Sequence, residues 1–178
     1  MTKQEIIQRL KENHQSFTSF ISLLDEKDFL FTVNDKWTPG QQAEHILRAV
    51  KPVVLAFRLP LFLLMVIFGN ANRPSRSYAG LADRYHEKLA GGGKASGRFI
   101  PPSVAYNQKN KTCCGITNAV EALCNNVAKV KEEDLDNYIL PHPLFGKLTM
   151  REMLYFTIYH VYHHQNNIKE LLKLRQSV

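Results

Sequence analysis

The chain opens with an alternation of apolar and polar residues that predicts a helix. Thr2 and Glu5 have the spacing of a capping box, in which each side chain accepts a hydrogen bond from a free backbone amide of the first turn. Apolar residues then recur at the spacing that lines one side of a helix: Ile6, Leu10, Phe17, Ile21 and Leu24. Residues 25–36 are acidic and break this pattern, so we expect a loop there.

A second helix is predicted to begin at Thr38. The threonine hydroxyl caps the first turn, and Pro39 already holds the φ angle of a helix, so the pair is typical of a helix start. Pro52 and Pro60 are expected to kink or end this helix, because proline cannot donate the backbone hydrogen bond of a helix interior.

Two more long helices are predicted in the second half of the chain. One runs from about Cys113 to Glu132, with a side made of apolar residues: Ile116, Val120, Leu123, Val127 and Val130. The other opens with a capping box at Thr149 and continues to about Leu174. Residues 134–146 contain two prolines and are expected to form a loop, and no segment alternates as a strand would. The pattern therefore predicts an all-α protein with four long helices.

A long connection, residues 69–111, separates the second and third of these helices. Asparagine, proline and glycine interrupt it repeatedly, with three glycines at 91–93, and leave room for one short helix from Ser77 to Leu89. A short turn would force the flanking helices to be antiparallel, whereas a connection of this length lets them run parallel. Connections this long are uncommon inside a compact domain and tend to be either functional or disordered.

Length and composition indicate one domain, which we place over residues 1–178. The first residues resemble no secretory signal. The longest apolar run, 53–68, is shorter than the about 20 residues of a membrane crossing and contains Arg58 and Pro60. The three cysteines form no CxxC pair, which argues against a secreted disulfide framework. We expect a cytoplasmic protein without a membrane span.

Positive charge is concentrated in one part of the chain. The formal net charge is +7, and the segment 51–111 holds ten Lys or Arg residues against Asp83 and Glu87, a local charge of +8. A nucleic-acid binder more often spreads its charge along a stripe interleaved with aromatic residues, so this local excess disfavours nucleic acid as the partner.

Histidines carry the most specific chemical signal. Residues four apart lie one above the other on a helix, so His160 and His164 aim their imidazoles at one point while His163 faces away. Their side of the helix is otherwise apolar, and buried imidazoles need partners for their ring nitrogens. The partner is either a shared metal ion or ordinary hydrogen bonds. His45 on the second helix favours the metal, because bundles build metal sites from inward-pointing side chains. His14 and His86 are expected at the surface.

The order of these motifs resembles the DinB/YfiT-like family over nearly the full length. The motifs are WTPGQQAEHIL at 37–47 and HPLFGKLTMREMLYFTIYHVYHHQNNI at 142–168. Members are four-helix bundles with an up-down-down-up course and a three-histidine metal site. The resemblance implies that His45, His160 and His164 are metal ligands, and that His142 supports the site from a loop. Gln41 and Glu44 flank His45 and are considered as supporting residues. The long basic insert between helices two and three departs from the family pattern.

The resemblance also implies a function. Three histidine ligands leave a coordination position open, which is the pattern of a catalytic metal, and Zn or Ni is the divalent transition metal we expect. Members of the family include low-molecular-weight-thiol S-transferases and a thiol-dependent isomerase. The first hypothesis is therefore a metal-dependent thiol S-transferase or hydrolase acting on a small molecule. The alternatives are a non-catalytic metal-binding stress-response module and, more remotely, a nucleic-acid or anionic-surface binder.

Two surface features add expectations about partners. The run Leu59–Phe68 is too apolar to be left in water, which predicts a homodimer unless the run packs inside the same chain. The basic segment is interpreted either as a solvated surface or as a rim that attracts an anionic substrate such as a carboxylate-bearing thiol. The residues expected at such a rim are Arg73, Arg76, Lys94 and Arg98.

Overall fold

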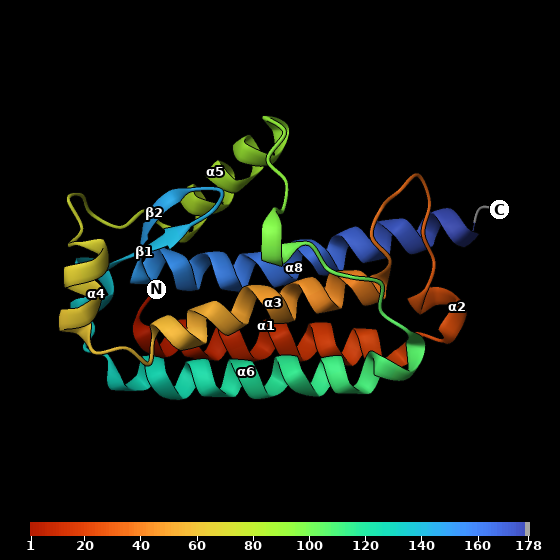
Figure 1. Cartoon of the computed structure of the whole chain (residues 1–178), viewed down its shortest axis with the longest axis horizontal. Coiled ribbons are helices and arrows are strands. Elements are labelled where there is room, and N and C mark those ends of the chain that lie inside the picture. Colours follow the sequence, from red (N-terminus) through yellow and green to blue (C-terminus); the bar gives the residue numbers. More distant parts are fainter. Residues whose placement is uncertain (177–178) are drawn as a thin grey trace.

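Four long helices lie side by side in the structure, a computed structural model that describes residues 1–176 (Figure 1). They are α1 (Lys3–Leu23), α3 (Pro39–Ala56), α6 (Lys109–Lys129) and α8 (Met150–Gln176). In Figure 1, α1 and α8 run from left to right, whereas α3 and α6 run from right to left. The predicted all-α, up-down-down-up four-helix bundle is therefore confirmed, with the long insert between the second and third helices of the bundle.

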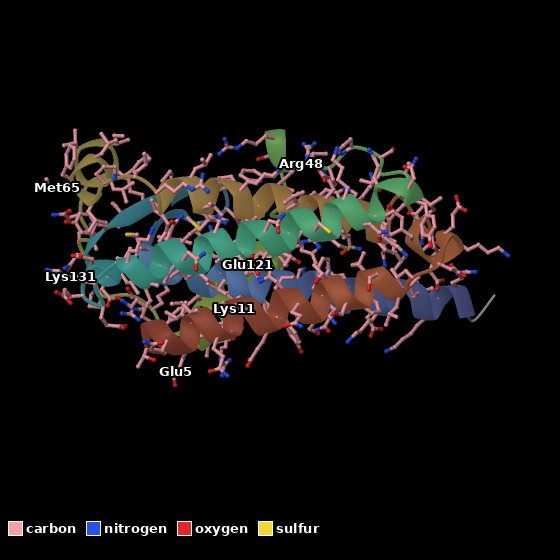
Figure 2. The ribbon with its side chains drawn as sticks, turned by 90° about the horizontal axis from the view of Figure 1, so that it is seen from below. Glu5, Lys11, Arg48, Met65, Glu121 and Lys131 are labelled. Atoms are coloured by element: carbon pink, nitrogen blue, oxygen red, sulfur yellow. The ribbon has the colours of Figure 1, made fainter. Side chains whose placement is uncertain are left out.

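The core lies between these four helices, because α6 and α8 each pack against both α1 and α3. The apolar positions predicted on the first helix are all buried, as are those of α6. The outer sides of α1 and α6 carry exposed charged residues such as Lys11 and Glu121 (Figure 2). Cys113 and Cys124 fill the interior, and Cys114 is exposed.

Each of three long helices begins at the cap that the sequence predicts. The Thr2 and Glu5 side chains form a reciprocal capping box on α1. Thr38 forms the equivalent box with Gln41 on α3, where Pro39 is the first helical residue. At the start of α8, the Glu152 backbone amide donates to Thr149 Oγ1, and the Thr149 amide donates to the Glu152 carboxylate.

The chain turns sharply after α3. Pro52 lies inside α3, and Pro60 precedes the short helix α4 (Leu61–Phe68), so Pro60 marks the break and Pro52 does not. The axes of α3 and α4 differ by 107°. Among the described residues, no single helix has the length and apolar content of a membrane crossing, although α3 and α4 together would have them if their bend is ignored.

Three short elements occupy segments that the sequence assigned to loops. They are α2 (Glu26–Phe29), α7 (Asp134–Asn137) and a two-stranded antiparallel hairpin of β1 (Ile139–His142) and β2 (Gly146–Thr149). The expectation that the chain lacks strands was therefore wrong for this hairpin. Its strands are too short for alternation to be detected, and they are stabilised by the buried pair Leu140 and Leu148, which lie opposite each other.

The long connection contains the predicted helix and reaches across the bundle. The helix α5 (Tyr78–Ala90) packs on α8, with Leu81 and Tyr85 buried (Figure 1). Two single-turn 3₁₀ helices come next, η1 (Gly97–Phe99) and η2 (Tyr106–Gln108), and η1 contacts α3. Beyond η2, α6 starts at Lys109, four residues earlier than the apolar pattern indicated.

Candidate metal centre

Three histidines from two helices meet in the interior of the bundle. His45 comes from α3, and His160 and His164 come from successive turns of α8. The Nε2 atom of His160 lies 3.1 Å from Nε2 of His45 and 3.1 Å from Nε2 of His164. Each of the three side chains is more than nine-tenths buried, at 6% to 7% exposure. The structure thus brings together the three residues that the sequence pattern selected.

The outer nitrogens of two of these rings are held by oxygen atoms. His45 Nδ1 lies 2.7 Å from the backbone oxygen of Phe99, and His164 Nδ1 lies 2.9 Å from Oε1 of Gln42. A carbonyl oxygen only accepts hydrogen bonds, so both Nδ1 atoms carry the proton and both Nε2 atoms present a lone pair. The Gln42 amide nitrogen donates to the backbone oxygen of Trp37 at 3.3 Å, which orients Oε1 toward His164.

The three converging nitrogens therefore fit a cation. His160 Nε2 faces the Nε2 lone pairs of His45 and His164. It carries at most one proton, which cannot point at both. One of its contacts is then between two lone pairs in a buried site, an arrangement that a shared metal ion relieves. Zn–N bonds of about 2.0–2.1 Å in a tetrahedral site place two ligand nitrogens roughly 3.3 Å apart. The observed 3.1 Å is close to that separation.

Burial keeps these imidazoles neutral, which is the form that binds metal. Burial lowers the pKa of His160 and His164 well below 6.5, and the neighbouring histidines lower it further. Burial also lowers the pKa of His45, although the hydrogen bond to Phe99 partly offsets the effect. All three imidazoles are therefore available to a metal ion at neutral pH without first losing a proton.

Aromatic rings surround the three histidines. The Trp37 ring centre lies 5.0 Å from that of His45, and the Phe156 ring stacks on His160 at 4.7 Å. Tyr85, from the long connection, meets His160 edge-on at 6.1 Å. These rings limit water around the site, and a low local dielectric strengthens electrostatic interactions inside it.

The remaining histidines take four different places. His163 faces away, as predicted, with its Nε2 2.9 Å from the Asn167 side-chain nitrogen, and His86 is exposed. His142 lies in β1, not in a loop, and its ring contacts Phe156 at 4.3 Å between centres. The expectation for His14 was wrong: it is 2% exposed, with Nδ1 bonded to the backbone oxygen of Leu10 and no partner for Nε2.

Sequence reasoning missed the residue that supports His164. Gln41 belongs to the capping box of α3, and Glu44 forms an ion pair with Arg48. The supporting residue is their neighbour Gln42, which faces the interior. Its position three residues before His45, on the same side of the helix, was the available signal.

The basic rim residues separate into two groups. Arg73 and Arg76 both bind the fully buried carboxylate of Glu152 at the start of α8, at 2.7 to 3.0 Å, and so do not line the histidine centre. The segment 97–100 lies against α3 instead. Phe99 accepts from His45, and Arg48 Nη1 donates to the backbone oxygen of Arg98 at 3.1 Å. The exposed side chains of Lys94 and Arg98 belong to this part of the connection.

Comparison with known proteins adds evidence about the fold. Neither a family model nor a curated protein sequence matches the chain. Among solved structures, the chain is similar to TT2238, described as a four-helix bundle protein, with a TM-score of 0.60 and 19% sequence identity. The match covers 95% of this chain and 99% of that one. At this identity, the likeness shows the bundle architecture alone.

Proposed function

We propose that this protein is a metal-dependent enzyme of the DinB/YfiT-like kind, in which His45, His160 and His164 hold one divalent transition metal, Zn or Ni. The observation that carries the proposal is the meeting of three Nε2 atoms in the interior of the bundle. In His45 and His164, an oxygen acceptor keeps the proton on Nδ1, so that Nε2 presents a lone pair to the centre. A metal site requires neutral imidazoles, which burial maintains here, and fixed rings, which the outer hydrogen bonds provide.

An enzyme is favoured over a purely structural site because, among the described residues, three candidate protein ligands converge and no fourth. When bound, such an ion would have an open coordination position for a thiolate or a water molecule and would act on it as a Lewis acid. The chain itself supplies the ring orientation through Gln42 and Phe99, and a water-limiting wall through Trp37 and Phe156. The reaction proposed is thiol S-transfer or hydrolysis of a small molecule. A non-catalytic metal-binding module is the alternative.

A small anionic thiol is the proposed substrate. Arg98 is an exposed cation on the segment that covers His45, Lys94 is an exposed cation four residues before it, and we propose that the two attract a carboxylate. Nucleic acid is disfavoured because much of the basic charge is used inside the molecule. Arg73 and Arg76 bind Glu152, and Lys109 donates to the backbone oxygens of Ser22 and Leu24.

The test begins with the metal. Protein purified without a histidine tag or added metal is expected to contain about one Zn or Ni per chain by elemental analysis. Changing His45, His160 and His164 together to alanine should abolish this content, whereas His163→Ala should preserve it. Protein that contains no metal and takes up none would refute the proposal.

The metal-loaded protein is then screened with carboxylate-bearing and neutral thiols and with hydrolysable esters and amides. The double change Lys94→Gln and Arg98→Gln should raise KM for the anionic thiol, with metal content unchanged and the effect shrinking as salt is added. The double change Lys11→Gln and Lys131→Gln, at two exposed lysines elsewhere on the bundle (Figure 2), is the charge-matched control. A loaded protein without turnover on any of these classes would favour the non-catalytic module.

We also propose that the protein is a homodimer that buries one side of α4. Most of this apolar helix faces solvent at the end of the bundle (Figure 1), with Phe62, Val66 and Ile67 more than half exposed. The rival expectation, that the run packs inside the same chain, applies to Leu64, which is fully buried, and in part to Leu61 and Phe68, which pack against the core. A second copy of the same surface would remove these side chains from water.

A further inference from the structure

A second group of imidazoles lies between the proposed metal centre and the solvent. His86 on α5 is exposed, His163 on α8 is half-buried, and His164 is buried. The ring centres of His86 and His163 are 6.4 Å apart, and those of His163 and His164 are 5.4 Å apart. Exposure therefore falls stepwise along a series of three histidines that ends on a proposed ligand.

We infer that His86 and His163 form a surface port that binds a divalent transition-metal cation briefly and passes it to the buried histidines. This inference rests on the proposed metal centre and concerns how the centre is loaded. Imidazole is the side chain best suited to the task, because it binds such cations while neutral and releases them readily when a better-coordinated site lies beside it.

The buried site needs such a route. The three central histidines are more than nine-tenths buried, and they line neither the cavity beside residues 68–73 nor the one beside Ser19, Cys114 and Thr117. A hydrated cation must exchange its water molecules for imidazole nitrogens one after another, so exposed imidazoles next to the centre let the exchange begin at the surface. Trp37 and the segment 97–100 cover the opposite, His45 side of the centre.

Charge at the port also favours a cation. Between Glu44 and Glu121 the chain has two acidic residues, Asp83 and Glu87, and both lie on α5 beside His86. Asp83 is three residues before His86 and therefore lies on the same side of the helix. Its carboxylate is close enough to Tyr159 to raise the pKa of that hydroxyl, after burial and Tyr162. Arg84 and Lys88 balance the two acids of α5, but each is two residues from His86 and faces away from it, so the charge on the side of His86 is that of Asp83.

The existing contacts at the port are ones that a cation can replace. The Tyr159 hydroxyl lies 2.5 Å from His86 Nε2, so this nitrogen is directed toward α8. The Asn167 side-chain nitrogen lies 2.9 Å from His163 Nε2. Each is a partly exposed hydrogen bond, and such bonds contribute little to stability because water can replace either partner.

The experiment measures how fast metal-free protein takes up Co²⁺. Stopped-flow absorption follows the visible d–d bands that appear when Co²⁺ becomes coordinated by histidine, and a chelator chase follows release. The double change His86→Gln and His163→Gln should slow uptake about tenfold, a factor typical of lost steering. Release should slow by the same factor, because a route serves both directions, so affinity and the final ratio of one Co²⁺ per chain should not change.

Charge is tested by a matched pair of substitutions. Asp83→Asn should slow uptake less than the double histidine change, and added salt should reduce its effect. Glu121→Gln, on α6 at the far side of the bundle (Figure 2), should leave the rate unchanged. Helical circular dichroism of the variants checks that these surface changes preserve the fold.

The outcomes separate the port from the centre. If the double histidine variant takes up and releases Co²⁺ at unaltered rates, the proposed role of His86 and His163 is wrong, while the proposed metal centre still stands. Loss of bound Co²⁺ from that variant would also overturn this role, because His86 or His163 would then be a ligand and not a step on the way. If the unaltered protein binds no Co²⁺, the metal centre itself is wrong.

Discussion

His164 donates a hydrogen bond from Nδ1 to the side-chain oxygen of Gln42 across 2.9 Å, and this bond joins α8 to α3 inside the bundle. Because the Gln42 oxygen only accepts, it keeps the His164 proton on Nδ1 and leaves Nε2 free to face His160. The orientation of one proposed ligand therefore depends on a residue from the other helix of the site.

Replacing Gln42 tests this dependence. Gln42→Leu removes the acceptor, frees the His164 ring and should lower metal affinity about 10- to 100-fold, while the protein still binds one ion. Gln42→Glu keeps an acceptor at the same place and should retain the affinity. Competition with a chromophoric chelator measures both. As a control, Gln41→Leu disturbs only the cap of α3 and should leave affinity unchanged; equal affinity in Gln42→Leu would contradict the role assigned to this bond.

Removing Glu152 should destabilise the fold without touching the histidines. Its fully buried carboxylate binds Arg73, Arg76 and the Thr149 amide. Glu152→Ala leaves these donors without an acceptor and should lower the free energy of unfolding by about 3 kcal/mol, measured by urea denaturation. Glu170→Ala, which removes an exposed ion pair with Lys173, should have no measurable effect. Similar losses in the two variants would refute the special role of Glu152.

His14 should make the metal-free protein sensitive to mild acid. Burial lowers the pKa of His14 to about 4 in the folded chain, against 6.5 for an ordinary histidine, despite its bond to Leu10. Between these values the unfolded chain takes up a proton that the folded chain does not. The free energy of unfolding therefore falls as pH drops below 6.5, by roughly 2 kcal/mol from this residue between pH 7 and pH 5.

The variant His14→Leu isolates that contribution. It removes the titrating group, and the apolar side chain needs no partner for the position now held by the unpaired Nε2. Urea denaturation at pH 7 and pH 5 should show that the variant loses less stability on acidification than the unaltered protein. Other buried histidines contribute equally to both proteins, so an identical loss in the two would show that His14 is not the acid-sensitive group.

The exposed side of α4 predicts the state of association. Light scattering at micromolar concentration should give twice the chain mass, and Val66→Glu should give a monomer, because a charge would be buried at the contact. Leu174→Glu alters an apolar residue of α8 that is also exposed and should not change the mass. A monomer mass for the unaltered protein would contradict the proposed homodimer.

Several misjudged positions show where local pattern stops being informative. His14 was expected outside because histidine is polar, yet its place in the series Ile6, Leu10, Phe17 and Ile21 is the buried side of α1. The helical periodicity therefore indicated that His14 is buried, whereas the polarity of its side chain suggested exposure. The hairpin 139–149 had no comparable signal, since its strands span four residues each and one of them is stabilised by contacts with α4, which is distant in sequence.

The amino-acid sequence by itself determined the four long helices, the capped starts of three of them and the pairing of His160 with His164, because each depends on spacing within one helix. Only the tertiary structure decided which surfaces meet. His45 is 115 residues from His160 along the chain. Phe99, which accepts a hydrogen bond from the His45 ring, is 54 residues from His45. Such contacts depend on the rotation and register of packed helices, which the periodicity of a single helix does not specify.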